Sequence, residues 1–200
     1  MRLAILVSGR GTNLAAVLEA VAEGRLSDVE PVLVVSNRPG VPALDVAAGH
    51  GVPTRVLPRA RFADAGARDA AIGRAVAEAG ADLALLAGYD QLLRPAYFAE
   101  FGGRTINIHP SLLPKHGGPG MMGLAVHASV LAAGDTQTGV TIHEVTPELD
   151  GGPVITQVNV AVLAGDTPER LAERVLAVEH RCLVEVLAHL SASMTAASRA

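Results

Sequence analysis

An amide and an imidazole lie two residues apart in residues 105–109, whose sequence is TINIH. Side chains two positions apart in a β-strand lie on the same face, and Pro110 removes a backbone donor and ends the strand. Asn107 and His109 would therefore lie together at a strand end, where they could handle an oxygen and a proton in a reaction. The alternative is that both side chains are structural and only satisfy hydrogen bonds at the end of the strand.

A glycine-rich turn follows the first apolar segment, residues 3–7. The turn comprises residues 8–13, with the sequence SGRGTN, and apolar residues at helical spacing come after it. A strand, a glycine turn and a helix in this order aim backbone N–H groups and the helix dipole at an anion. The lysine of a P-loop and the third glycine of a dinucleotide-binding fingerprint are both absent from this segment. We therefore predict a site for a single phosphate, with a turn that merely begins a helix as the alternative.

Segments of strand character alternate with segments of helical character along the chain. Strands are expected at residues 3–7, 31–35, 54–57, 82–87, 105–109, 139–146 and 154–162, and helices after residue 13 and over residues 42–50, 63–79, 124–133 and 167–190. This alternation predicts an α/β fold, a single-domain, open and mainly parallel sheet with helices on both faces, ended by an antiparallel C-terminal strand pair. Ligands of such sheets bind at the carboxyl ends of the strands, where the glycine turn, residues 88–90 and the Asn107–His109 pair are expected to lie.

The composition limits the class of protein. The 200 residues suffice for one domain with a large core, because half of them are apolar. The net charge is −4 and no basic run is present, which argues against a nucleic-acid-binding surface. The single cysteine, Cys182, excludes an intrachain disulfide and a zinc-type cysteine cluster. No secretion signal or apolar segment of membrane-spanning length is evident, so we expect a cytoplasmic protein. We also expect small-molecule partners and either a monomer or a homodimer.

Residues 115–123, with the sequence KHGGPGMMG, are too rich in glycine for a regular element. The segment begins shortly after His109, so we expect it to lie beside the site. Its four glycines make ordering entropically unfavourable, and we predict a mobile lid that becomes ordered over bound ligand. The alternative is an exposed loop that does not contact ligand.

Two separated motifs resemble those of the folate-dependent formyltransferases. They are residues 107–114, NIHPSLLP, and residues 149–153, LDGGP, and the opening SGRGTNL agrees as well. The resemblance extends over residues 1–190, which are expected to form a Rossmann-like formyltransferase domain, followed by a frayed tail at residues 191–200. It implies transfer of a formyl group from the co-substrate 10-formyltetrahydrofolate to the amine of phosphoribosylglycinamide in purine biosynthesis, without a metal ion.

In that family the Asn, His and Asp of the two motifs are catalytic, which implies Asn107, His109 and Asp150 here. The amine would attack the formyl carbon and form a tetrahedral species with negative charge on oxygen. Asn107 and protonated His109 could stabilise that oxygen, and Asp150 would favour the charged imidazole and accept or relay protons. His143 shares this neighbourhood, and both a direct role and a structural role remain open for it.

The resemblance also implies binding residues. Those expected to contact the phosphate and the ribose or glycinamide part of the substrate are Gly11, Thr12, Asn13 and Glu179. Those expected to contact the folate, largely through backbone groups, are Tyr89, Asp90, Gln91, Leu92, Leu93 and Asn107. Many relatives carry Met-Arg where this chain has Asp90-Gln91, so the resemblance does not extend to side-chain contacts with folate at these two positions. The phosphate-binding arginine is either Arg61 or Arg68.

Other functions share part of this pattern. A methionyl-tRNA formyltransferase would need a C-terminal nucleic-acid-binding domain, and a formyltetrahydrofolate hydrolase would carry an N-terminal regulatory domain. A folate-binding module without activity has no need for Asn, His and Asp together. The nature of the formyl acceptor, an amine, water or tRNA, distinguishes these alternatives.

Overall fold

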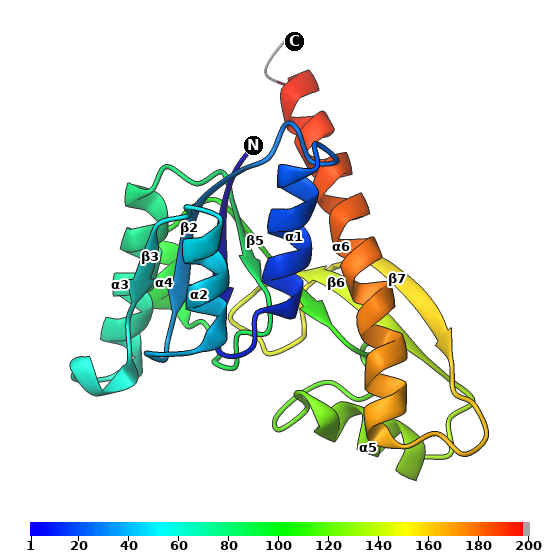
Figure 1. Ribbon diagram of the computed structural model, residues 1–200. Helices are drawn as coiled ribbons and strands as arrows, with labels where there is room; N and C mark the ends of the chain where they lie inside the picture. Colours follow the sequence, from blue (N-terminus) through cyan, green and yellow to red (C-terminus); the bar gives the residue numbers. More distant parts are fainter. Residues whose placement is uncertain (198–200) are drawn as a thin grey trace. The chain divides into compact units, whose positions relative to one another are not determined.

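The computed structural model describes residues 1–197, and its elements alternate as the sequence predicts (Figure 1). The strands are β1 (Arg2–Val7), β2 (Glu30–Ser36), β3 (Thr54–Val56), β4 (Leu83–Leu86), β5 (Arg104–His109), β6 (Gln137–Glu144) and β7 (Val154–Ala161). The helices are α1 (Thr12–Ala22), α2 (Pro42–Gly49), α3 (Ala65–Glu78), α4 (Pro95–Glu100), α5 (Leu124–Ala132) and α6 (Pro168–Ala197), with a short 3₁₀ turn, η1 (Arg59–Arg61). All the predicted strands and helices are present.

The strands form a seven-stranded sheet in the order β3-β2-β1-β4-β5-β6-β7. β1 pairs in parallel with β2 and with β4, and β2 pairs in parallel with β3. β6 and β7 form an antiparallel pair. The predicted fold class, a mainly parallel α/β sheet ended by an antiparallel pair, is confirmed. The chain proceeds from β1 out to β3 and returns to β4 on the other side of β1, so the strand order reverses between β1 and β4.

The first compact unit comprises residues 1–106 and the chain from residue 184 onward. β1 lies at its centre, and residues 3–7 are fully buried. A continuous apolar run is stable here because the strand has neighbours on both sides and helices on both faces. α1 packs beside α2 and α3 packs beside α4, and the two pairs lie on opposite faces of this part of the sheet (Figure 1).

The second compact unit comprises residues 107–183. β6 is buried except at its two ends, whereas the edge strand β7 is largely exposed. The hydroxyl of Thr141, on β6, donates to the Ser111 carbonyl at 2.6 Å and accepts from the Leu113 backbone N–H at 3.0 Å. This hydroxyl therefore holds the irregular segment that follows β5.

The final helix is longer than the sequence predicts. α6 continues through Ala197, so the predicted frayed tail is wrong for residues 191–197, and residues 198–200 lie outside the described part of the chain. Ser191 is 3% exposed, so the helix still buries a face at this point. The hydroxyls of Ser193 and Thr195 donate to carbonyl groups four residues earlier, which satisfies them within the helix. Neither α6 nor any other helix within residues 1–197 is long and apolar enough to cross a membrane.

Candidate active site

Asn107 and His109 lie in the last part of β5, which ends before Pro110 as predicted. His109 is 5% exposed, and Asn107 is half-buried. Polar groups with so little access to water need fixed partners or a bound ligand. The two side chains are therefore held in a defined environment and are not solvated surface groups.

Asn107 is bonded to His143, which lies on β6. Asn107 Nδ2 lies 3.1 Å from His143 Nε2, and His143 Nδ1 lies 2.8 Å from the Glu144 carbonyl oxygen. Since a carbonyl oxygen only accepts, His143 Nδ1 carries a proton. Burial lowers the pKa of His143, although the Glu144 carbonyl and Asp150 act in the opposite direction. The neutral ring then accepts from Asn107 at Nε2, which orients the amide and leaves its second N–H for another acceptor.

Asp150 lies in the turn before β7 with a φ of 52°, a conformation that aspartate tolerates better than most residues. Its Oδ2 accepts from the Gly118 backbone N–H at 2.7 Å, and its Oδ1 lies 3.8 Å from His143 Nε2. Asn107, His143 and Asp150 are therefore connected in one polar cluster within the second unit. The predicted effect of Asp150 on the protonation of His109 stays a prediction.

The glycine-rich segment of residues 115–123 contacts two of the three residues predicted to be catalytic. The carbonyl oxygen of His116 accepts from His109 Nε2 at 2.9 Å, and the Gly118 N–H donates to Asp150. The segment therefore lies beside these residues, as its place in the sequence predicts.

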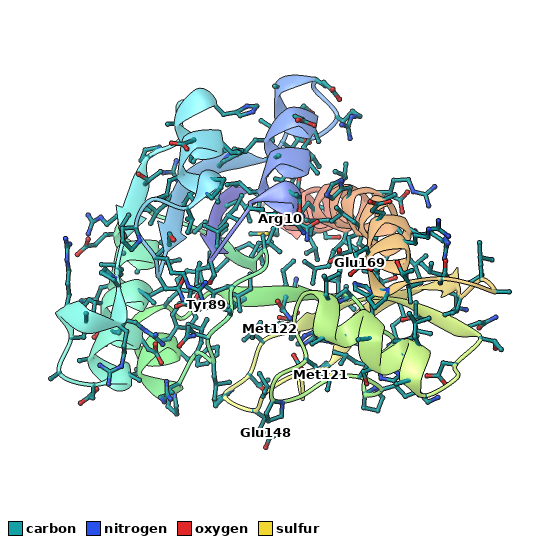
Figure 2. The ribbon with its side chains drawn as sticks, turned by 60° about the horizontal axis from the view of Figure 1, so that its bottom comes forward. Arg10, Tyr89, Met121, Met122, Glu148 and Glu169 are labelled. Atoms are coloured by element: carbon teal, nitrogen blue, oxygen red, sulfur yellow. The ribbon has the colours of Figure 1, made fainter. Side chains whose placement is uncertain are left out.

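The second half of this segment, residues 119–123, is mostly exposed. Met121 is half-buried and Met122 is 50% exposed, both just before α5 (Figure 2). Two flexible apolar side chains thus lie on the mostly exposed part of the segment, which is the arrangement that the predicted lid requires. Its mobility stays a prediction.

His127 is a buried histidine that the sequence reasoning misses. It lies on α5 with 4% of its surface exposed, and its Nδ1 has no hydrogen-bond partner among the described residues. Burial lowers the pKa of His127, and charge on nearby His109 lowers it further. The available signal was a histidine in the mostly apolar helix LAVHASVLA. His127 is a further candidate for contact with substrate.

The predicted phosphate turn lies in the first unit, at the start of α1, where Figure 2 labels Arg10. Gly11 has a φ of 77°, and a Cβ at this position would lie 2.7 Å from the Ala43 Cβ. The Gly9 carbonyl accepts from the Ala43 N–H at 3.1 Å, so the turn packs directly on the start of α2. The first turn of α1 carries no acidic residue, which leaves the positive end of its dipole uncompensated.

The predicted folate-binding turn follows β4. The Asp90 N–H donates to Ser8 Oγ at 2.9 Å, so the turns after β1 and β4 meet at one edge of the sheet, as predicted. The Asp90 carboxylate accepts from Asn37 Nδ2 at 2.7 Å and pairs with Arg38. Burial alone would raise the pKa of Asp90, but its hydrogen bonds and the Arg38 charge lower it. The carboxylate is therefore charged and engaged within the protein.

A buried ion pair on α3 supports the same turn. Arg68 and Asp69 are 1% and 0% exposed, and Arg68 Nη2 lies 2.8 Å from Asp69 Oδ1. Arg68 Nη1 also donates to Gln91 Oε1 at 3.2 Å. Asp69 Oδ2 accepts from the Arg94 N–H at 3.1 Å. Of the two candidate phosphate-binding arginines, Arg68 is therefore engaged inside the first unit, whereas Arg61 is exposed.

Three further residues of the predicted binding set are buried. Tyr89 is 8% exposed, its hydroxyl has no hydrogen-bond partner within residues 1–197, and burial raises its pKa (Figure 2). Leu93 is 1% exposed. Glu179, in the second unit, is 8% exposed on α6. Burial of the Tyr89 and Leu93 side chains fits the expectation that this turn would contact folate through its backbone.

The fold and the cluster of amide, imidazole and carboxylate groups agree with the formyltransferase class that the two sequence motifs indicate. A family model described as formyl transferase matches residues 1–187. This chain belongs to the formyl transferase family.

Similar proteins indicate a particular member of that family. The chain is 39% identical over 187 residues to the chloroplastic phosphoribosylglycinamide formyltransferase of Arabidopsis thaliana, covering 93% of this chain and 64% of that protein. It is 37% identical over 180 residues to the phosphoribosylglycinamide formyltransferase of Escherichia coli, covering 90% of this chain and 82% of that protein. The crystal structure of glycinamide ribonucleotide transformylase 1 from Symbiobacterium toebii matches with a TM-score of 0.89 and 38% identity, covering 96% of this chain and 88% of that one.

Proposed function

We propose that this protein transfers a formyl group from 10-formyltetrahydrofolate to the amine of phosphoribosylglycinamide, a step of purine biosynthesis. The observation that carries the proposal is the similarity to phosphoribosylglycinamide formyltransferases of a plant and a bacterium over at least 90% of this chain. We further propose that residues 1–190 form the formyltransferase domain. The protein would act on small molecules in the cytoplasm, as a monomer or a homodimer.

The reaction exchanges one carbon–nitrogen bond for another. The substrate amine attacks the formyl carbon, a new C–N bond forms, and the formyl oxygen gains negative charge. The bond from that carbon to the folate nitrogen then breaks. One proton leaves the amine and one proton is taken up by the folate nitrogen, so tetrahydrofolate is released and no covalent intermediate with the protein forms. The protein must stabilise the oxygen and move protons.

The polar cluster of the second unit supplies groups for both tasks. Asn107 has one amide N–H bonded to His143, so its second N–H is the donor for the formyl oxygen. Protonated His109 would provide a second donor and a proton source. Asp150, held by the Gly118 N–H, would accept or relay the proton that the amine loses. In this assignment His143 positions Asn107 and does not itself touch substrate.

Binding groups come from backbone as well as from side chains. Gly11, Thr12 and Asn13 would bind the substrate phosphate, because the N-terminal turn of α1 carries no competing acidic residue. Glu179 would contact the ribose or glycinamide part. The folate would contact residues 89–93 mainly through backbone groups, together with Asn107. This fits the structure of the turn, in which the Asp90 and Gln91 side chains are bonded to other protein groups.

The decisive experiment offers labelled 10-formyltetrahydrofolate to the purified protein with each of three acceptors: phosphoribosylglycinamide, water alone and charged initiator tRNA. We expect label in phosphoribosylglycinamide, with His109→Ala as the inactive control. Label released as formate at the same rate without the amine would identify a hydrolase instead. Label in tRNA would identify a methionyl-tRNA formyltransferase, and binding without turnover would leave only a folate-binding role.

A further inference from the structure

Both ring nitrogens of His116 form hydrogen bonds within the second unit. His116 Nδ1 lies 2.8 Å from Ser129 Oγ on α5, and His116 Nε2 lies 2.8 Å from Asp135 Oδ2 just beyond this helix. Lys115 Nζ lies 2.9 Å from the other oxygen of the same carboxylate. Because a carboxylate only accepts, the His116 Nε2 carries a proton. The ring therefore has a fixed position between a hydroxyl and a carboxylate.

The backbone of His116 has an unusual conformation. Its φ is 54°, in the left-handed region that residues with a side chain rarely adopt. A strained backbone persists where surrounding contacts hold it in place. The two ring contacts of His116, with Ser129 and Asp135, are contacts of this kind. The Ser111 hydroxyl adds another, since it donates to the Lys115 carbonyl at 2.7 Å.

This backbone directs the His116 carbonyl at the ring of His109. The carbonyl oxygen lies 2.9 Å from His109 Nε2 and 3.4 Å from the Ser111 hydroxyl, which also donates to it. Since the oxygen can only accept, His109 Nε2 carries a proton. A neutral His109 then has its lone pair on Nδ1, and a charged His109 has a second N–H there. Only Nδ1 is left to exchange a proton with a ligand.

We infer that Ser129, Asp135 and the His116 ring form a positioning device for His109, with the reacting nitrogen being His109 Nδ1. The inference rests on the proposed function for the statement that His109 reacts, whereas the protonation pattern is a property of the protein alone. Ser129 and Asp135 do not touch His109. They act through the His116 backbone, and a shift of that carbonyl would release the ring to rotate or to change tautomer.

Nitrogen-15 NMR of histidine-labelled protein tests the pattern directly, at a pH where His109 is neutral. Long-range nitrogen–proton couplings distinguish a proton on Nε2 from a proton on Nδ1. We expect His109 to carry its proton on Nε2 in the wild-type protein, whether or not the protein transfers formyl groups. A proton on Nδ1 would overturn the inference. The measurement is independent of activity, so a missing formyl transfer would count only against the proposed function.

Variants test the device itself. In Ser129→Ala/Asp135→Ala we expect a mixture of His109 tautomers and a fall in kcat of up to about a hundredfold, because small misplacements of a reacting group have effects of this size. KM should change little. Asp135→Asn keeps an acceptor oxygen and should restore much of kcat relative to Asp135→Ala.

Lys115→Ala is the matched control, because it removes the other partner of Asp135 and leaves both contacts of the His116 ring. Lys115 is exposed, and this variant should keep the wild-type tautomer and kcat. A folded double variant with an unchanged tautomer and unchanged kcat would overturn the inference. Thermal unfolding of each variant identifies any that lose the fold. If the double variant does not fold, the inference is tested by the His109 tautomer of the wild-type protein and by the kcat of Asp135→Asn.

Discussion

The two compact units present polar groups to ligands in different ways. In the first unit the predicted phosphate turn offers backbone N–H groups at the start of α1. In the predicted folate turn, the Asp90 and Gln91 side chains are hydrogen-bonded to other side chains of the protein. In the second unit the candidate groups are side chains, with Asn107 bonded to His143 and Asp150 held by a backbone N–H. In the proposed assignment, the turns of the first unit bind ligand through their backbone, and the second unit supplies the side chains of the chemical step.

The two units also differ in the kind of ionisable group that they bury. The first unit buries permanent charges in pairs, with Arg68 beside Asp69, and such pairs are structural because their charge does not change near neutral pH. The second unit buries histidines, and burial lowers the pKa of both His127 and His143. Imidazoles change protonation at modest energetic cost near neutral pH, which suits a proton-transfer site.

The largest effect on activity is expected from the three residues assigned to the chemical step. Asn107→Ala, His109→Ala and Asp150→Ala should each raise the activation free energy by about 2.7–4 kcal/mol, because each removes a preorganised group. The single-turnover rate would then fall by roughly two to three orders of magnitude. Double variants should lose much less than the sum, since the three residues act on one transition state.

The exposed His50 provides a matched control, because His50→Ala makes the same chemical change in the first unit. It should leave turnover unchanged. Wild-type turnover in His109→Ala would show that the second unit does not carry the chemistry and would end the comparison between the units.

The next largest effect is expected in the first unit, at Gly11. Gly11→Val forces a β-branched residue to a φ of 77° and places its Cβ against Ala43, which together disfavour the turn by roughly 1–3 kcal/mol. We expect calorimetry to show weaker binding of phosphoribosylglycinamide by about ten- to a hundredfold, with folate binding nearly unchanged.

Gly9→Ala is the control for this experiment, since a Cβ at Gly9 would meet nothing within 4 Å. It should bind both ligands normally. Equal weakening of both ligands by Gly11→Val would mean that the turn is only structural, and the phosphate assignment would be wrong.

Local patterns were sufficient to predict most of the fold. The apolar run at residues 3–7 and the alternation at residues 105–109 correspond to β1 and β5, because burial on one or both faces imposes these periods. The end of α6 was predicted wrongly. Its last turns are Ala- and Ser-rich and lack a clear apolar stripe, yet Ser191 is buried and the hydroxyls bond within the helix.

Candidate site residues could be predicted only where their residue types and local spacing indicate a reaction. Asn107 and His109 could be paired from their spacing in a strand. The bond between Arg68 and Gln91, or between His116 and Asp135, joins residues far apart in the chain, and no local period encodes it. His127 was missed for the same reason, since its burial depends on the packing of α5 and not on its neighbours in sequence.

An intermediate effect is expected from the segment that precedes α5. Deleting residues 119–122 should lower formyl transfer about tenfold, or roughly 1.4 kcal/mol, and raise the share of formyl groups lost to water. The deletion removes Met121 and Met122 but keeps Gly118, whose N–H holds Asp150. The catalytic cluster is therefore retained while the proposed cover is lost.

Hydrogen exchange provides the physical readout for this lid. The Met121 and Met122 N–H groups donate only to carbonyl groups of the same segment, at 3.1 and 3.0 Å. If the segment opens locally in the free protein, the N–H groups of residues 120–123 should exchange quickly, and they should become protected when both ligands bind. The Gly118 N–H should be protected in both states, because it is already bonded to Asp150, and so serves as an internal control. Unchanged exchange together with normal turnover in the deletion variant would show that the segment is an ordinary exposed loop.

The smallest effect is expected at Gln91, and it tests the comparison most sharply. If the folate turn binds through its backbone, Gln91→Ala should change the folate KM by no more than about twofold, which corresponds to roughly 0.5 kcal/mol of binding free energy. Arg68 would lose one of its acceptors but would keep Asp69. Arg68→Met is the contrasting variant, because it removes the buried partner of Asp69 and leaves only the Arg94 contacts at 3.1 and 3.4 Å. It should lower the free energy of unfolding by up to about 3–5 kcal/mol. A large rise in folate KM for Gln91→Ala, at unchanged stability, would mean that the first unit also recognises its ligand with side chains. The division between a backbone-binding unit and a side-chain-reacting unit would then hold only for the phosphate turn.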